Sequence, residues 1–137
     1  MLLSLNCLIL GQDTSNIFDT AVGKISTIKG VAIEFEKLSV AKFKEILFSS
    51  EELQGITKMN IWKVELEFND INNFSTEDDI KNHVKSVKMD DNPMLKLKSY
   101  YNNEDKVPKD ECLHIFIVPI TTGKCTLIFY LSNRNLQ

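Results

Sequence analysis

The 137-residue sequence is poor in the residues that usually carry chemistry or cross-links, with three cysteines, two histidines and one tryptophan. Three cysteines without a C-x-x-C pair are too few for a disulfide framework, and they fit a reducing compartment best. Cys7 and Cys112 lie in or beside apolar runs, so we interpret them as small buried hydrophobic residues. Two histidines without a paired cysteine or carboxylate at ligand spacing indicate neither a metal site nor a cofactor.

The sequence also lacks an excess of positive charge and any long apolar run. Lys and Arg number 16 against 19 Asp and Glu, and the two signs are interleaved, which argues against a nucleic-acid-binding domain. No window approaches the roughly 18 apolar residues that a membrane span needs. The segment Met1–Leu10 lacks the basic region and the small-residue cleavage pattern of a secretion signal, so we interpret it as a buried strand.

Apolar residues make up 43% of the sequence, which is enough for one domain with a substantial core. The run Leu113–Ile120 has the β-branched and aromatic residues of a strand that is buried on both faces. The other such run is Leu2–Leu10. We predict that these two strands from opposite ends of the sequence lie side by side in one sheet.

The spacing of apolar residues predicts further elements between these runs. Gly30 supplies the positive φ of a small hairpin that we expect as an insertion at the sheet edge. Helical spacing begins at Ser39, a typical N-cap residue, and again at Ser75, where Asp78 would complete a capping box. The predicted strands are Ile17–Val22, Ile25–Ile28, Val31–Phe35 and Ile61–Phe68.

The same spacing predicts which side chains face the core. In the first helix the solvent face carries Lys42, Lys44 and Glu45. The residues predicted to face inward are Val40, Phe43, Ile46 and Leu47 in the first helix, Trp62, Val64, Leu66 and Phe68 in the alternating strand, and Ile80, Val84 and Val87 in the second helix.

The order strand, strand, small hairpin, helix, strand, helical connection, strand predicts an α+β fold of the β-grasp, or ubiquitin-like, type with a mixed sheet and one main helix. A ferredoxin-like sandwich is the competing interpretation. It requires a helix directly after the first strand, and Gly11–Asn16 is too short for one.

Motifs that could carry chemistry are weak. Gly123 and Lys124 follow a predicted strand, but Val118 and Cys125 stand where a phosphate-binding loop needs Gly and Ser or Thr. Cys112 and His114 share one face of a strand, yet a buried thiol and a hydrogen-bonded histidine are the commoner arrangement.

Two surface features have a similarly modest interpretation. Trp62 could anchor a partner, although on an alternating strand a tryptophan more often belongs to the core. Lys81, Lys85 and Lys88 follow helical spacing between clusters of acidic residues, which is typical of a solvated face.

Several segments in register resemble the N-terminal module of Crinkler effectors, in the form found in fungi. The segments that carry the likeness are Leu5–Gly11, Asn16–Phe18, Val40–Phe48, Met59–Leu66 and Leu113–Ile120. The stretches Gly123–Cys125 and Tyr130–Asn133 resemble the region that comes after this module in fungal members.

The resemblance implies that residues 1–120 are a noncatalytic, ubiquitin-like header domain. Such a domain belongs to an effector that is secreted by a route without a recognised signal and is delivered into a host cell, often to the nucleus. It implies an unidentified host protein as partner and no catalytic residue in this module. The candidate interaction positions are Trp62, Lys63, Val64, His114, Ile115, Val118 and Pro119.

Residues 121–137 are expected to be an extra strand, through which a homodimer could form, or the start of a linker to a C-terminal effector domain. The alternative function is an intracellular adaptor that binds its partner by strand addition at the sheet edge.

Overall fold

A computed structural model of the chain describes residues 3–90, 92, 94–101 and 111–120. Its main sheet has five strands in the order β2-β1-β7-β5-β6, and β3 and β4 form a second sheet of two strands. The strands are β1 (Leu3–Ile9), β2 (Phe18–Val22), β3 (Ile25–Ile28), β4 (Val31–Glu34), β5 (Met59–Glu67), β6 (Val87–Lys88) and β7 (Cys112–Pro119). The helices are α1 (Val40–Phe48) and α2 (Glu77–Lys81), with short 3-10 turns η1 (Thr14–Asn16), η2 (Phe35–Lys37), η3 (Glu51–Leu53), η4 (Phe68–Asn73) and η5 (Leu97–Tyr100).

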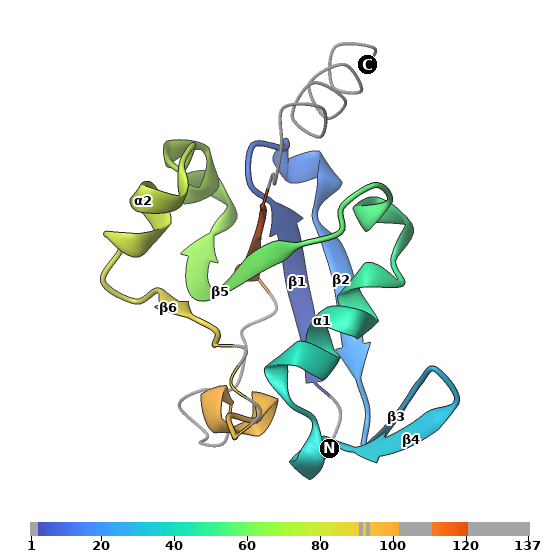
Figure 1. The fold of residues 1–137 in the computed structure, drawn as a ribbon. Helices are drawn as coiled ribbons and strands as arrows, with labels where there is room; N and C mark the ends of the chain where they lie inside the picture. Colours follow the sequence, from blue (N-terminus) through green and yellow to red (C-terminus); the bar gives the residue numbers. More distant parts are fainter. Residues whose placement is uncertain (1–2, 91, 93, 102–110, 121–137) are drawn as a thin grey trace.

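Strand β7 lies at the centre of the main sheet, parallel to β1 and antiparallel to β5 (Figure 1). The predicted adjacency of the two apolar runs is therefore confirmed. Ile115 and Ile117 are fully buried on the face that α1 covers, while Phe116 and Leu113 belong to the core cluster on the opposite face. A strand with neighbours on both sides and apolar layers on both faces accounts for the unbroken apolar sequence.

The arrangement is the predicted β-grasp. Strands β1 and β2 form an antiparallel hairpin with no α-helix between them, which excludes the ferredoxin-like alternative. Helix α1 then crosses one face of the mixed sheet (Figure 1). No helix among the described residues is long and apolar enough to cross a membrane.

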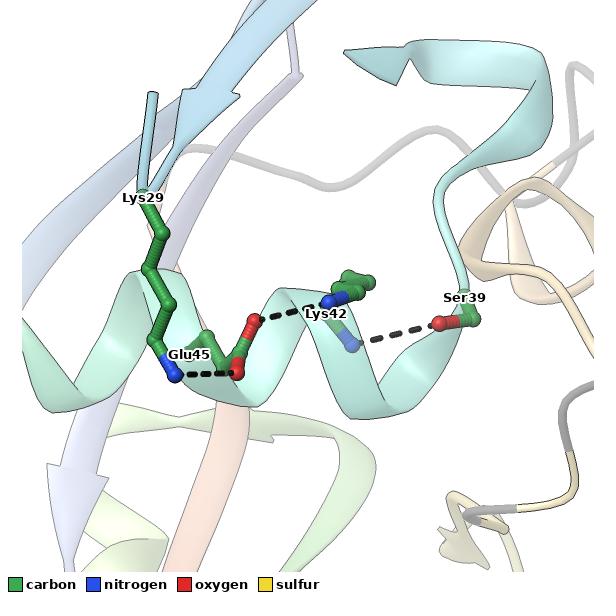
Figure 2. A network of polar contacts seen from close by, with 4 residues as sticks. All are labelled: Lys29, Ser39, Lys42 and Glu45. Carbon is green, nitrogen blue, oxygen red and sulfur yellow. Dashed lines mark hydrogen bonds and ion pairs between the residues drawn. The ribbon is translucent and has the colours of Figure 1, made fainter. Parts of the chain in front are cut away.

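The small hairpin of β3 and β4 is also confirmed, but it forms a sheet of its own instead of widening the main sheet. Both of its turn residues have positive φ, 52° at Lys29 and 81° at Gly30, as a tight hairpin turn requires. Lys29 Nζ lies 3.2 Å from a carboxylate oxygen of Glu45 in α1, and Glu45 also pairs with Lys42 at 3.4 Å (Figure 2). The Lys29–Glu45 pair joins the hairpin tip to the helix, whereas the Lys42–Glu45 pair lies within the helix.

Helix α1 begins after Ser39, whose hydroxyl accepts a hydrogen bond from the backbone N–H of Lys42 (Figure 2). Val40, Phe43 and Leu47 are fully buried, as predicted. The prediction for Lys44 was wrong: only 9% of this residue is exposed, and its Nζ donates a hydrogen bond of 2.9 Å to the backbone carbonyl of Met59. Its long carbon chain follows the apolar surface and delivers the ammonium group to the start of β5.

Strand β5 buries Trp62, Val64 and Leu66 on one face, as its alternation predicts. Phe68 was predicted to face inward as well, but β5 ends at Glu67, and Phe68 starts η4 with 40% of its surface exposed. The register with β7 shifts between Lys63 and Leu66, so a bulge re-aims the chain just before this end.

Helix α2 is shorter than predicted. Its N-terminal capping box lies one residue later than expected and pairs Thr76 with Asp79. Ile80 is buried, but the helix ends at Lys81, and Val84 and Val87 are 92% and 48% exposed instead of facing the core.

Candidate functional site

The seven predicted interaction positions lie on the neighbouring strands β5 and β7. Four of them are almost fully buried: Trp62, Val64, His114 and Ile115. Lys63, Val118 and Pro119 are half-buried. A partner could not contact the four buried side chains without local opening of the sheet, so in the closed fold these residues act through packing.

Trp62 joins the sheet to α2. Its indole Nε1 donates a hydrogen bond of 2.8 Å to Oε2 of Glu77, and the amide Nδ2 of Asn60 donates to the same oxygen at 3.0 Å. The indole is 7% exposed, which is the core position that its alternating strand favours. Lys63, on the other face, places its Nζ 4.9 Å from the centre of the Tyr101 ring in a cation–π contact.

His114 is held between two central strands. Its Nδ1 accepts a hydrogen bond of 2.8 Å from the backbone N–H of Asn6, and the side-chain amide of Asn6 donates to the carbonyl oxygen of Cys112 at 2.9 Å. An Nδ1 that accepts a hydrogen bond carries no proton. The Nδ1 of His114 is thus occupied by the backbone N–H of Asn6. Cys112 and His114 are both buried, as expected for a buried thiol and a hydrogen-bonded histidine.

Cys7 is a structural residue in the core. Desolvation raises the pKa of its thiol to about 12, an effect that the hydrogen bond with the Thr20 hydroxyl only partly opposes. The thiolate required of a nucleophile is therefore disfavoured at neutral pH. Gly123, Lys124 and Cys125 lie outside the described residues.

An open groove of about 910 Å³ is formed where β5 ends and β7 begins. Its lining residues are Glu65, Glu67, Phe68, Asn69, Lys85, Glu111 and Cys112. Lys85 Nζ lies 3.7 Å from a carboxylate oxygen of Glu65, which leaves an excess of negative charge in the lining. Phe68 adds an exposed aromatic surface. This combination suits a partner segment that carries both a cation and an apolar side chain.

Sequence reasoning missed this groove because it depends on two local events. The bulge after Lys63 and the end of β5 at Glu67 turn Phe68 out of the core, and β7 begins beside them at Cys112. The acidic pattern of Glu65 and Glu67 was visible, but it indicated only the solvent side of a strand. In the part of the chain that the structure describes, no three His, Cys, Asp or Glu side chains are grouped to hold a metal ion.

The basic segment of Lys81, Lys85 and Lys88 has the solvated character that the sequence predicts. All three residues are exposed, and Lys85 pairs with Glu65 across the groove. Helix α2 ends at Lys81, so the three lysines do not share one helical face.

Comparison with protein-family models gave a match. The family model described as the Crinkler effector protein N-terminal domain matches residues 3–118, which run from the first residue of β1 to the penultimate residue of β7. Neither the curated proteins nor the solved structures contained a match to the chain.

Proposed function

The chain belongs to the Crinkler effector N-terminal domain family, and from this premise we propose that it is a noncatalytic N-terminal module of a host-directed effector. In this proposal the module serves in delivery into a host cell or in binding a host protein there. The observation that carries the proposal is the extent of the family match, which includes β1, β2, β5 and β6 and all but the last residue of β7.

The chemistry of the core supports a noncatalytic role. Cys7, Cys112 and His114 are buried. His83 is half-buried, and its ring lies against Phe74 while its Nδ1 accepts a hydrogen bond from the backbone N–H of Lys85. The hydrogen bonds of Asn6 to His114 and to the carbonyl oxygen of Cys112 join β1 to β7, so the imidazole strengthens the sheet.

Binding of a host protein needs an exposed surface, and the groove at the end of β5 is the surface we propose. Burial of an aromatic side chain at the centre of a contact supplies much of the binding energy of many interfaces, and Phe68 is available for this role. The carboxylates of Glu67 and Glu111 would favour a basic segment and increase its rate of association.

The cellular route is the finer part of the proposal. Effectors of this family act in a host cell, so we propose secretion, followed by entry into the host and, for some effectors of this kind, the nucleus.

The experiment uses the full chain fused to a reporter, presented outside host cells and also expressed inside them. We expect the fusion to enter the cells or to change the location of the reporter, and to retain a specific host protein. A fusion that does none of these contradicts the proposed role in delivery or host binding.

Groove variants then locate the contact. Phe68→Ala combined with Glu67→Lys should weaken capture of the host protein at least tenfold, whereas Val84→Ala, at a 92% exposed site outside the groove lining, should not. Equal capture by both variants contradicts the groove assignment while leaving the effector role of the domain intact.

The alternative function, an intracellular adaptor that binds by strand addition, is favoured by one observation. Strand β2 is an edge of the main sheet with β1 on one side only, among the residues described. Capture of a partner from extracts of the producing organism, with none from the host, would support the adaptor over the effector module.

A further inference from the structure

The two edges of the main sheet differ in how they are protected against strand addition. Strand β6 has two residues, it ends in Lys88, and its neighbour β5 contains a bulge. Short length, lysine and bulges are the devices by which natural edge strands avoid pairing with other chains. Strand β2 has five residues, contains no lysine, proline or bulge, and carries a single charge at Asp19.

The backbone directions in β2 follow from hydrogen bonds elsewhere in the sheet. The N–H groups of Asn6 and Leu10 both point toward β7, because they donate to His114 Nδ1 and to the carbonyl oxygen of Ile117. Backbone groups alternate in direction along a strand, so those of Leu5 and Cys7 point toward β2.

Thr20 and Phe18 are the register partners of Leu5 and Cys7, and their backbone groups therefore point back toward β1. The residues between and after them, Asp19 and Ala21, direct both N–H and C=O away from the sheet. The exposed edge thus offers two donors and two acceptors in the spacing of an antiparallel ladder. Figure 1 shows β2 as the outer strand beside β1.

We infer that this edge pairs with β2 of a second copy of the chain, antiparallel and centred on Thr20. In this register Asp19 of each copy lies opposite Ala21 of the other, so the outward N–H and C=O groups of both residues are all paired. Thr20 lies opposite Thr20 at the two-fold axis. The pairing joins two five-stranded sheets into one continuous sheet of closed, two-fold symmetry.

Side-chain chemistry favours a second copy as the occupant, because β2 complements itself in this register. The carboxylate of Asp19 faces a small neutral side chain instead of its own equivalent, and both Asp19 and Ala21 are exposed. On the other face Phe18, which is half-buried, lies opposite Val22, which is fully buried in its own domain, so this pair brings no second charge to the contact.

The register predicts that a positive and a negative side chain at position 21 change the dimer Kd in opposite directions. Ala21→Lys places a cation opposite Asp19 of the other copy, and Ala21→Asp places a second carboxylate there. Each dimer contains two such pairs, so we expect the lysine variant to lower the dimer Kd about threefold or more and the aspartate variant to raise it by at least as much. In any register that places Ala21 opposite itself, both variants would weaken the dimer.

The measurement is sedimentation velocity of the full chain over a concentration series, with circular dichroism to check that each variant is folded. Ala32→Asp and Ala32→Lys provide matched controls at an exposed alanine of β4, and they should leave the Kd within about twofold.

Two results would overturn the inference. One is a parent chain that remains monomeric up to about 1 mM, the weak end of measurable association. The other is a dimer in which Ala21→Lys and Ala21→Asp change the Kd in the same direction, or no more than the Ala32 controls do.

Discussion

Replacement of His114 tests whether this residue acts as a structural clasp between β1 and β7. His114→Leu keeps a side chain of similar size in a site that is 3% exposed, but it removes the nitrogen that accepts the Asn6 backbone N–H at 2.8 Å. The N–H of Asn6 is then left without this acceptor in the interior of the sheet.

The expected loss follows from the cost of such an orphaned donor. Leaving a buried N–H unpaired costs about 1–3 kcal/mol, and burial of the apolar leucine offsets part of this cost. We therefore expect the free energy of unfolding to fall by about 1–2 kcal/mol. For a domain of this size that corresponds to a decrease in Tm of about 4–8 °C.

The assay combines thermal unfolding with hydrogen exchange of the Asn6 amide measured by NMR. His114→Asn is the matched control, because its side-chain oxygen can take a place near that of Nδ1 and accept the same hydrogen bond. We expect Asn6 exchange to be about tenfold faster in the leucine variant than in the asparagine variant. A leucine variant with unchanged Tm and unchanged Asn6 exchange would refute the proposed stabilising role of the His114–Asn6 hydrogen bond.

Two further predictions concern groups buried beneath or within α1. Folding raises the pKa of Cys7 from 9.0 to about 12, so its contribution to stability is complete below about pH 9 and is lost as the pH rises toward 12, up to about 4 kcal/mol in all. Urea unfolding at increasing pH should show this loss, and Cys7→Ala should reduce it; an identical pH profile in the variant would contradict the assignment. Lys44→Met keeps the buried carbon chain but removes the donor to the Met59 carbonyl, so we expect a loss of about 1–2 kcal/mol, measured from urea midpoints. The control Lys42→Met, at a residue on the exposed side of the same helix, should change stability by less than about 0.5 kcal/mol, and equal losses at the two sites would argue against a specific role for Lys44.

The parts of the fold that could be predicted are those in which one local pattern has one structural solution. The unbroken apolar sequence of β7 requires cover on both faces, and this places it inside the sheet beside β1. The spacing of Val40, Phe43 and Leu47 similarly defines the buried face of α1, and Ser39 defines its start. In each case the spacing of apolar residues follows directly from which faces of the strand or helix are buried.

Two of the errors arose where a hydrogen bond to a backbone carbonyl, which apolar spacing does not encode, decided the outcome. Lys44 reaches the carbonyl of Met59, 15 positions away, and helical spacing holds no information about that acceptor. Helix α2 ends where the hydroxyl of Ser86 bonds to the carbonyl oxygens of Ile80 and His83, so the apolar spacing that continues to Val87 has no helix to support it. Local periodicity identifies residues that could be buried, but hydrogen bonds to backbone groups decide which of them are.

The same reasoning separates recognition from packing along β7. From Leu113 to Ile117 its side chains are buried, and from Ile115 to Ile117 it has paired strands on both sides, so no partner can reach these side chains in the closed fold. Only its two ends meet solvent: Glu111 and Cys112 line the groove, and Ile120, just beyond the other end, is 39% exposed. Strand β7, whose sequence carries part of the family likeness, can therefore contribute to binding only by positioning the residues at its two ends. The groove at the first end and the pairing edge of β2, two strands away, are the surfaces where substitutions can change binding without first disrupting the core.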